Sequence, residues 1–450
     1  MFRLCLLLSV LIAMSAYQGP ISWHRVSRPH RLLSVRKANP IVGTLHADAE
    51  ASFLALDERT HRLFILGGAD GEIGVFDTRS SRLIRNVNIA NRGPRSVVGM
   101  LSPVVDAQGG RVFVAVQGAG GPRESGVAVL DATTGKPVHA FIPLASPVSI
   151  ALDAPAKRLF IGHGDSVRGT GSVSILDANT GRFLRRVNVG HYPGELVVDA
   201  RTERVFAGVL TPTVRSVSFR GGIAPTRYYS GVVMLDARTG SVLHKVGAGA
   251  FMLTVDERRN RVFAFDAAQD GVAPAHSMDV IDAMTGLVRH IVHFGAAESA
   301  LAIDGVALDD RTDHLFAVTG GVDGSDGVVT MLDARSGVVL HAERVGPVPS
   351  AIVVDGRVGE VFIAYWDQVD NHDYQVDGTI SPDGPGSVAV FDARSGRRAR
   401  TITVGAGPTA LTMDGRTQRL LVLDQGDEGA IPPALSEPGD VTIIDARRSR

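Results

Sequence analysis

The stretch SIALDAPAKRLFIGHGDSVRGTGSVSILDANTGRFLRRVNV, residues 149–189, contains one complete unit of the pattern that organises this chain. Four apolar segments, SIALD, RLFIG, SVSILD and RFLRRVNV, have the length and the Val, Ile, Leu and Phe content typical of β-strands. In DANTG the aspartate can accept hydrogen bonds from backbone N–H groups two or three residues later, and the glycine permits the left-handed conformation of a bulged hairpin. The unit therefore predicts four antiparallel strands, A to D.

Both turn phrases of this unit recur along the chain. Phrases like ILDANTGR occur eight times with their aspartates 46 to 59 residues apart, and phrases like LDAPAKRLFIG occur eight times in alternation with them. The former aspartates are expected to end strand C: Asp77, Asp131, Asp177, Asp236, Asp282, Asp333, Asp392 and Asp445. The latter are expected to end strand A: Asp57, Asp106, Asp153, Asp199, Asp256, Asp309, Asp355 and Asp414. Because no long stretch has a helical period, the pattern indicates an all-β repeat array.

The ends of the array favour a closed ring. Four short strands cannot bury both faces of their own sheet, so neighbouring sheets must stack, and a ring of such sheets is a β-propeller. The last unit stops after a strand C, DVTIIDA (440–446), while an unpaired candidate strand, NPIVGTLHA (39–47), precedes the first strand A. Their pairing completes an eighth blade and removes the free sheet edges. The sequence thus predicts one propeller domain over residues 39–450.

These phrases resemble the repeats of a known family. VVDARTERVF (197–206) and VMLDARTG (233–240) are similar to the repeats of YVTN-repeat, YncE-like β-propellers, and the resemblance extends over nearly all of the chain after its N-terminal segment. It implies a periplasmic or extracellular protein but no particular reaction, because propellers with such repeats have unrelated functions. The family usually has seven blades, which makes seven the alternative to the eight counted here.

The N-terminal segment MFRLCLLLSVLIAMSA (1–16) has the layout of a secretory signal peptide, with an early arginine, a short apolar run and small residues. We therefore expect an exported protein with no transmembrane span after cleavage. The single cysteine, Cys5, lies in this segment, which excludes disulfides and cysteine chemistry from the mature chain. Residues 17–38 are predicted to be a solvated basic linker.

The charge balance gives no indication of a nucleic-acid partner. Lys and Arg number 46 and Asp and Glu number 47, so no whole-molecule field would attract a polyanion. We expect a monomer whose partner is a protein or a small molecule.

The spacing of the aspartates indicates where a site would lie. In a propeller, the A–B and C–D turns lie on one face, here called the turn face, and the B–C and D–A connections lie on the other, the loop face. The distance from the strand-A to the strand-C aspartate varies from 20 to 37 residues although the A–B turn hardly varies, so the B–C connections carry the variation. Because loops carry function more often than scaffold turns, we expect the site on the loop face.

Aromatic and charged residues in the longest connections predict a binding rim. Blade 4 has LTPTVRSVSFRGGIAPTRYYSG (210–231), and blade 7 has YWDQVDNHDYQVDG (365–378). The predicted ligand- or partner-binding residues are Arg227, Tyr228, Tyr229, Tyr365, Trp366, His372 and Tyr374, with His191 and Tyr192 from a D–A connection. The alternative is a solvated loop whose aromatic residues pack on their own blade.

Two further hypotheses involve a metal. Calcium is the one cofactor that any pattern suggests. Blade 7 has four aspartates whose carboxylate oxygens are hard ligands of the kind that calcium prefers: Asp367, Asp370, Asp373 and Asp377. Their spacing is not that of an EF-hand. A metal-dependent, lactonase-like hydrolase at the channel mouth is the alternative to a binding protein. Its nearest residue pairs, His163 with Asp165 and His191 with Glu195, form no tight cluster, so the sequence favours a binding or scaffold protein over an enzyme.

Overall fold

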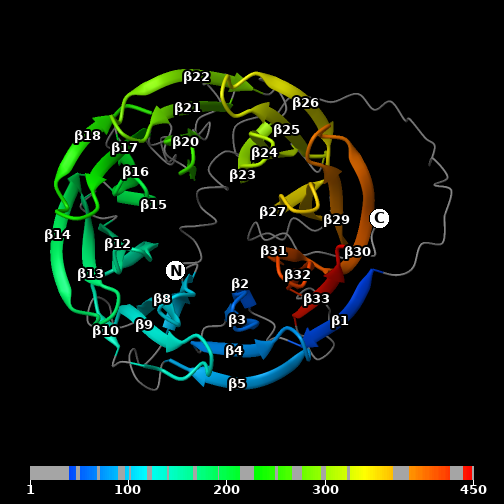
Figure 1. The fold of residues 1–450 in the computed structure, drawn as a ribbon, viewed down its shortest axis with the longest axis horizontal. Helices are drawn as coiled ribbons and strands as arrows, with labels where there is room; N and C mark the ends of the chain where they lie inside the picture. Colours follow the sequence, from blue (N-terminus) through cyan, green and yellow to red (C-terminus); the bar gives the residue numbers. More distant parts are fainter. Residues whose placement is uncertain are drawn as a thin grey trace, which may run out of the picture.

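The structure is a computed structural model, and it shows a ring of eight antiparallel sheets (Figure 1). It describes residues 40–46, 51–67, 71–89, 97–100, 103–118, 124–138, 141–165, 170–190, 192–212, 228–248, 252–265, 276–294, 300–321, 325–367, 385–425 and 439–447. The described residues form 33 strands and no helix. The all-β prediction and the prediction of eight blades are both confirmed.

Each blade has the predicted strand order A to D from the channel outwards. The A strands are β2 (Ala51–Asp57), β6 (Val97–Met100) with β7 (Val104–Asp106), β11 (Pro147–Asp153), β15 (Tyr192–Asp199), β19 (Met252–Asp256), β23 (Ala300–Asp309), β27 (Val348–Asp355) and β31 (Pro408–Asp414). The B strands are β3 (Arg62–Gly67), β8 (Arg111–Gly118), β12 (Arg158–Asp165), β16 (Arg204–Pro212), β20 (Arg261–Phe265), β24 (His314–Gly321), β28 (Glu360–Trp366) and β32 (Arg419–Asp424).

The two outer strands complete each blade, and every predicted aspartate ends an A or a C strand. The C strands are β4 (Glu72–Asp77), β9 (Gly126–Asp131), β13 (Thr170–Asp177), β17 (Tyr228–Asp236), β21 (His276–Asp282), β25 (Val328–Asp333), β29 (Pro385–Asp392) and β33 (Asp440–Asp445). The D strands are β5 (Arg82–Asn88), β10 (Ile142–Pro143), β14 (Phe183–Gly190), β18 (Val242–Val246), β22 (Val288–Phe294), β26 (Val339–Arg344), β30 (Arg398–Ala406) and β1 (Ile41–His46).

The ring closes through the two ends of the array, as the sequence predicted. Strand β1 pairs antiparallel with β33, with Ile41 opposite Ile444 and Leu45 opposite Val441. Because β1 supplies strand D to blade 8, this blade combines residues that are about 400 positions apart in the sequence (Figure 1). The predicted signal peptide (1–16) and linker (17–38) lie outside the described residues, and among the residues that are described no helix is long and apolar enough to cross a membrane.

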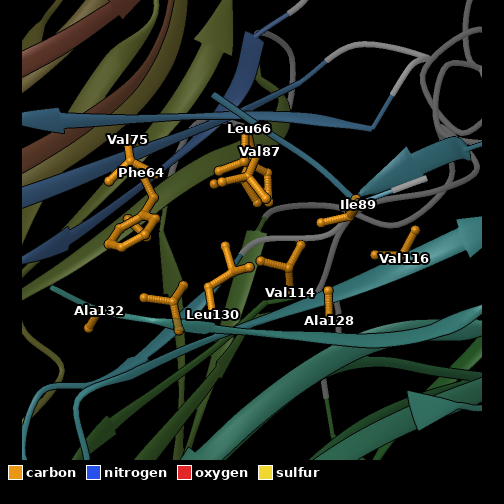
Figure 2. Close-up of a cluster of buried hydrophobic side chains, with 13 residues drawn as sticks. Phe64, Leu66, Val75, Val87, Ile89, Val114, Val116, Ala128, Leu130 and Ala132 are labelled. Atoms are coloured by element: carbon orange, nitrogen blue, oxygen red, sulfur yellow. The ribbon is translucent and has the colours of Figure 1, made fainter. Parts of the chain in front are cut away.

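The hydrophobic core is divided among the eight interfaces between blades. Strand β3 shows the principle: Phe64 and Leu66 pack against blade 2, whereas Leu63 and Ile65 pack against blade 8. Figure 2 shows the first of these interfaces, where side chains of blades 1 and 2 meet. A strand that is buried on both faces must be apolar at successive positions, which explains the unbroken apolar runs of the B strands.

The turns have the predicted chemistry. In the C–D turn of blade 3, the Asp177 Oδ1 accepts from the N–H groups of Asn179 at 3.1 Å and Thr180 at 2.8 Å, and Gly181 has φ +70°. The A–B turns differ in one respect, because the left-handed position is often not glycine: Glu203 has φ +55° in blade 4. The Ala178 N–H donates to the Lys157 carbonyl, which places both kinds of turn side by side on one face.

The glycine of a C–D turn has a second role, in contacts between blades. A Cβ atom on Gly240, in blade 4, would lie 2.8 Å from the Ile175 Cδ1 and 3.0 Å from the Val187 Cγ2 of blade 3. Gly240 also has φ +71°. This turn therefore needs glycine both for its backbone conformation and for the close approach of the neighbouring blade.

We predict that Gly240→Ala costs about 2–4 kcal/mol, because a left-handed alanine adds to overpacking of a buried interface. The matched control is Gly359→Ala, where φ is +73° but nothing lies within 4 Å of the added Cβ atom. We expect this control to cost only about 1 kcal/mol, from the conformation alone. Urea denaturation of both variants measures the difference, and equal losses would contradict the interblade contact.

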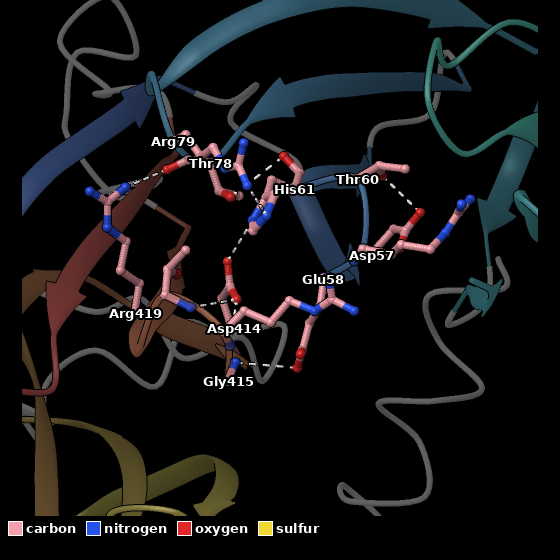
Figure 3. Close-up of polar contacts among 12 residues, drawn as sticks. Asp57, Glu58, Thr60, His61, Thr78, Arg79, Asp414, Gly415 and Arg419 are labelled. Atoms are coloured by element: carbon pink, nitrogen blue, oxygen red, sulfur yellow. Dashed lines mark hydrogen bonds and ion pairs between the residues drawn. The ribbon is translucent and has the colours of Figure 1, made fainter. Parts of the chain in front are cut away.

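Polar contacts between blades follow a regular pattern on the turn face. The aspartate that ends strand A faces the left-handed residue of the next blade's A–B turn. Lys157 Nζ lies 3.1 Å from the Asp106 Oδ2, and His61 Nδ1 lies 3.4 Å from the Asp414 Oδ2 (Figure 3). Between blades 5 and 6 the facing groups are two carboxylates, and a buried arginine joins them.

That arginine is Arg261, whose side chain is 4% exposed. Its Nη2 donates to the Asp256 Oδ2 at 2.6 Å and to the Asp313 Oδ1 at 2.7 Å. Its Nη1 donates to the Ala334 carbonyl. The guanidinium therefore bridges two buried carboxylates across the interface, and two more exposed arginines, Arg259 and Arg335, add to their neutralisation.

We predict that Arg261→Met destabilises the fold by about 1–3 kcal/mol, because it removes the buried donor that the two carboxylates share and leaves them to the more exposed Arg259 and Arg335. The control is Arg258→Met, which removes a pair with Asp310 whose side chains are 62% and 50% exposed. Exposed pairs contribute about 0–1 kcal/mol, so the control should denature close to the wild type. The two urea midpoints give the comparison, and a mild effect at Arg261 would show that the network does not support the interface.

Candidate functional site

The predicted rim residues of blade 7 begin at the loop-face end of strand β28. Trp366 is the last residue of this strand, and the connection to β29 leaves from the same face as the connection from β16 to β17 in blade 4. The prediction that the two longest B–C connections share one face is therefore consistent with the strand topology. Both connections start at the ends of B strands, the second strands from the channel.

Trp366 is held at the junction of blades 7 and 8. Its indole Nε1 donates to the Pro408 carbonyl at 3.1 Å, and the Ser350 hydroxyl donates to the same oxygen. Pro408 begins strand A of blade 8, so the indole is fixed by the neighbouring blade. The side chain remains partly exposed, which leaves an oriented aromatic surface beside the blade 7 connection.

Tyr365 has a different position from the one predicted. Its side chain is only 6% exposed and packs with Phe316, Val345 and Phe391 in the interface between blades 6 and 7. Its ring also lies against Gly346, where a Cβ atom would clash with it. Burial raises the pKa of the Tyr365 hydroxyl, and the nearby Asp367 carboxylate raises it further. Tyr365 therefore contributes to the core, and it is not an exposed contact residue.

Several other predicted site residues cannot be placed. Arg227, His191, His372, Tyr374, Asp370, Asp373 and Asp377 lie outside the described residues. The backbone of Tyr228 and Tyr229 forms the start of β17, and the structure describes no position for their side chains. Of the four predicted calcium ligands, Asp367 alone is described, and its Oδ2 accepts a hydrogen bond from the Ser387 hydroxyl. Among the described residues, no three His, Asp or Glu side chains form a group that could hold a metal ion.

A second set of predicted residues lies at the loop-face ends of blades 3 and 4. Tyr192 begins strand β15, and its ring lies against the backbone of Gly164 in β12, where a Cβ atom would clash. The Glu195 Oε2 accepts from the Leu253 N–H at 2.6 Å, across the interface to blade 5. Enclosure by the inner strands raises the pKa of Glu195 to about 7, although this hydrogen bond lowers it.

His163 belongs to strand β12 and not to a connection, and it is 6% exposed. Burial lowers the pKa of His163 to about 4, and the carbonyl of Ala145, which bonds to Nδ1, acts in the opposite direction. The imidazole is therefore neutral at physiological pH. His163, which was considered for the hydrolase alternative, is thus enclosed within the sheet and closed off from solvent.

One buried carboxylate at the loop face was not among the predicted site residues. Asp424 ends strand β32 and is 1% exposed. Its Oδ2 accepts from the Thr442 hydroxyl at 2.6 Å, and its Oδ1 has no hydrogen-bond partner among the described residues. Burial raises the pKa of Asp424 to about 7, and the nearby Asp440 carboxylate adds to this effect.

Asp424 forms the buried end of a small polar group. Asp440 lies opposite it in the pairing of β32 with β33, and His46 of β1 bonds to the Asp440 Oδ1 through Nδ1 at 2.8 Å. The side chain of Asp440 is 32% exposed and that of His46 is 81% exposed. Because Asp424 is also opposite Pro408, whose carbonyl holds Trp366, the group continues the Trp366 site into blade 8. We call these residues the blade 7/8 site: Trp366, Asp367, Asp424, Asp440 and His46.

We predict that Asp424→Asn changes how stability depends on pH. The carboxyl has a pKa near 3.8 when unfolded and about 7 when folded, so the folded state binds the proton more tightly and wild-type stability falls as the pH rises from about 4 to about 7. Asparagine stays neutral and can still accept from Thr442. Thermal denaturation between pH 4 and 8 should show that the variant gains on the wild type across this range.

Asp392→Asn should change the pH dependence of stability in the opposite direction. Partial burial raises the pKa of Asp392, but hydrogen bonds from Ser395 and from the Arg394 N–H hold it below its usual range overall. Its contribution is present above the unfolded pKa and is lost in acid, so this variant should lose stability relative to the wild type as the pH rises above about 4. If the stability of the two variants relative to the wild type changed with pH in the same way, the raised pKa of Asp424 would be contradicted.

The fold and the repeats define the protein as a β-propeller. No family model matches the chain. Over 164 residues, 36% of this chain, it is 26% identical to the uncharacterized protein YncE of Salmonella typhi and to that of Salmonella typhimurium, and the match spans 42% of those proteins. Taken with the eight-bladed ring, this similarity fits a YncE-like propeller.

Solved structures agree on the fold. Sqt1 of Saccharomyces cerevisiae superposes with a TM-score of 0.58 at 14% identity, over 90% of this chain and 99% of that one. A europium-containing methanol dehydrogenase superposes with a TM-score of 0.55 at 12% identity, over 90% of this chain and 93% of the other. At such identities the likeness shows the propeller fold alone.

Proposed function

We propose that this protein is an exported β-propeller that binds a partner or ligand on its loop face, at the blade 7/8 site. The observation that carries the proposal is Trp366, a partly exposed indole whose orientation is fixed by the Pro408 carbonyl of the next blade. Fixed aromatic side chains are favourable contact residues, because they bury a large area at little cost in conformational entropy. The signal-like segment 1–16 supports export.

The charges around Trp366 indicate the chemistry of the partner. Asp367 and Asp440 are partly exposed carboxylates, and Asp424 is a buried carboxylate whose Oδ1 accepts no hydrogen bond within the described residues. All three side chains are acceptors when ionised, so a complementary surface would present hydrogen-bond donors or positive charge. We propose that His372 and Tyr374 extend this surface along the blade 7 connection. We propose that the predicted rim residues of blade 4 and of the connection before it form a separate part of the loop face across the ring: Arg227, Tyr228, Tyr229, His191 and Tyr192.

Site-specific crosslinking tests this proposal. A photoreactive amino acid replaces Gln425, which is partly exposed and follows Asp424 at the loop face, and in a control protein it replaces Leu287, which is 56% exposed beside a C–D turn of blade 5. We expect a defined crosslinked species from position 425 alone. Excess unlabelled wild type should compete for it, whereas excess Trp366→Ala should not. Equal crosslinking from both positions, or equal competition by Trp366→Ala, would place the contact surface elsewhere.

A metal assay separates this proposal from the hydrolase alternative. Purified protein is analysed for divalent ions and assayed with lactone and ester substrates before and after chelation. A binding protein should show no hydrolysis that depends on a bound ion. A stoichiometric ion that is lost together with hydrolysis on chelation would instead establish the enzyme.

A further inference from the structure

A basic cleft lies on the turn face at the junction of blades 8 and 1. Its volume is about 350 Å³, within the range of roughly 300–1,000 Å³ seen for small-molecule sites. Four arginines and one carboxylate line it, together with Thr417: Arg79, Arg416, Arg419, Arg447 and Asp445. The four guanidinium groups exceed the single carboxylate by three positive charges.

The position of the cleft follows from the way the ring closes. In the other blades a continuous C–D turn joins the two outer strands, as Asp177 to Gly181 does in blade 3. In blade 8, strand C is β33 and strand D is β1, so no such turn joins them. Asp445 ends β33, and the described chain continues through Ala446 to Arg447. The Asp445 N–H donates at 2.9 Å to the carbonyl of Pro40, the residue before β1.

The cleft arginines contact neutral acceptors and no carboxylate. The first residue of strand B makes an ion pair with the aspartate that ends strand C in blade 1, where Arg62 lies 2.5 Å from Asp77, and in blade 4, where Arg204 lies 3.3 Å from Asp236. The equivalent Arg419 instead donates to the Thr78 carbonyl of the next blade, as Arg111 donates to the Ala178 carbonyl. Within the described part of the chain, no carboxylate lies within ion-pair distance of any of the four cleft arginines.

Three of the arginines are held in place by neutral groups. Besides Arg419, the Arg447 Nη2 donates to the Thr417 carbonyl at 2.8 Å, and the Arg79 Nη2 lies 2.7 Å from the His61 Nε2 (Figure 3). Each guanidinium has five N–H groups, so most of its donors stay available. Arg416 is exposed, and its side chain bonds to no described residue.

We propose that this cleft binds a compact oxyanion with two or more negative charges, of the pyrophosphate type. Arginine forks match phosphate and carboxylate oxygens in bidentate geometry, and guanidinium groups that are already oriented lose little entropy on binding. A multivalent anion would balance the excess of three positive charges. The cleft lies on the turn face, so this proposal is independent of the partner site on the loop face.

The test uses the full mature chain and inorganic pyrophosphate as the probe. Isothermal titration compares the wild type with Arg416→Gln/Arg447→Gln, and with the control Arg201→Gln/Arg238→Gln, which removes exposed arginines from the equivalent A–B and C–D turn positions of blade 4. We expect the cleft variant to weaken binding at least tenfold and the control to change it less than twofold. Pyrophosphate should also raise the melting temperature of the wild type and of the control.

Arg416→Gln alone guards against a folding defect, because this side chain makes no hydrogen bond within the described residues. It should melt like the wild type without ligand and still bind pyrophosphate more weakly. Binding should fall with added salt, as expected for a partly exposed charged site. Equal weakening in the cleft and control variants would overturn the proposal. So would an absence of binding at millimolar pyrophosphate, or binding only to phosphatidic acid vesicles and not to the soluble anion.

Discussion

The structure depends on the burial of each blade between two neighbours. A four-stranded sheet whose B strand is apolar on both faces has no stable state on its own, because each face needs a partner. Leu63 and Phe64 are adjacent in β3 and pack against different blades. Without closure, blades 1 and 8 would each expose one such face, so the pairing of β1 with β33 supports the eighth interface as well as one sheet. Closure by residues from both ends is therefore a condition for the whole ring.

The fold could be predicted because its signals are local and repeated. Asp177 and Gly181 set a turn within five residues, and the same pattern recurs in blades 1 to 7, with Ser81 in place of the glycine in blade 1, so the strands and their order follow from the sequence. Contacts between blades could not be predicted in the same way. Gly240 packs on Ile175 from a turn about 65 residues away, and the bridge that Arg261 makes to Asp313 crosses to another blade. These contacts depend on how neighbouring sheets stack, and the residue spacing within one repeat does not indicate how they do so.

The candidate site shows the same limit at the level of single residues. Trp366 was predicted at a contact surface, and the structure places its indole at the loop face; its neighbour Tyr365 was predicted there too and is buried. Side chains alternate along a strand, so successive residues of β28 point to opposite faces. Alternation alone would not have separated the two, because both faces of a B strand are buried, and Trp366 is partly exposed because it is the last residue of the strand. Asp424 and Asp440 had no such signal, because the register of β32 with β33 brings them together across a long connection.

Both proposed sites involve blade 8, and the reason lies in how this blade is built. In two of the regular blades the first residue of strand B pairs with the aspartate that ends strand C, as Arg62 does with Asp77. Blade 8 takes its strands from both ends of the array, and its outer pair lacks the usual turn. Arg419 bonds to a backbone carbonyl of blade 1, and within the described residues the Asp424 Oδ1 on the opposite face accepts no hydrogen bond. Blade 8 therefore presents arginine donors on its turn face and a carboxylate acceptor on its loop face, and a ligand on either face could contact these groups.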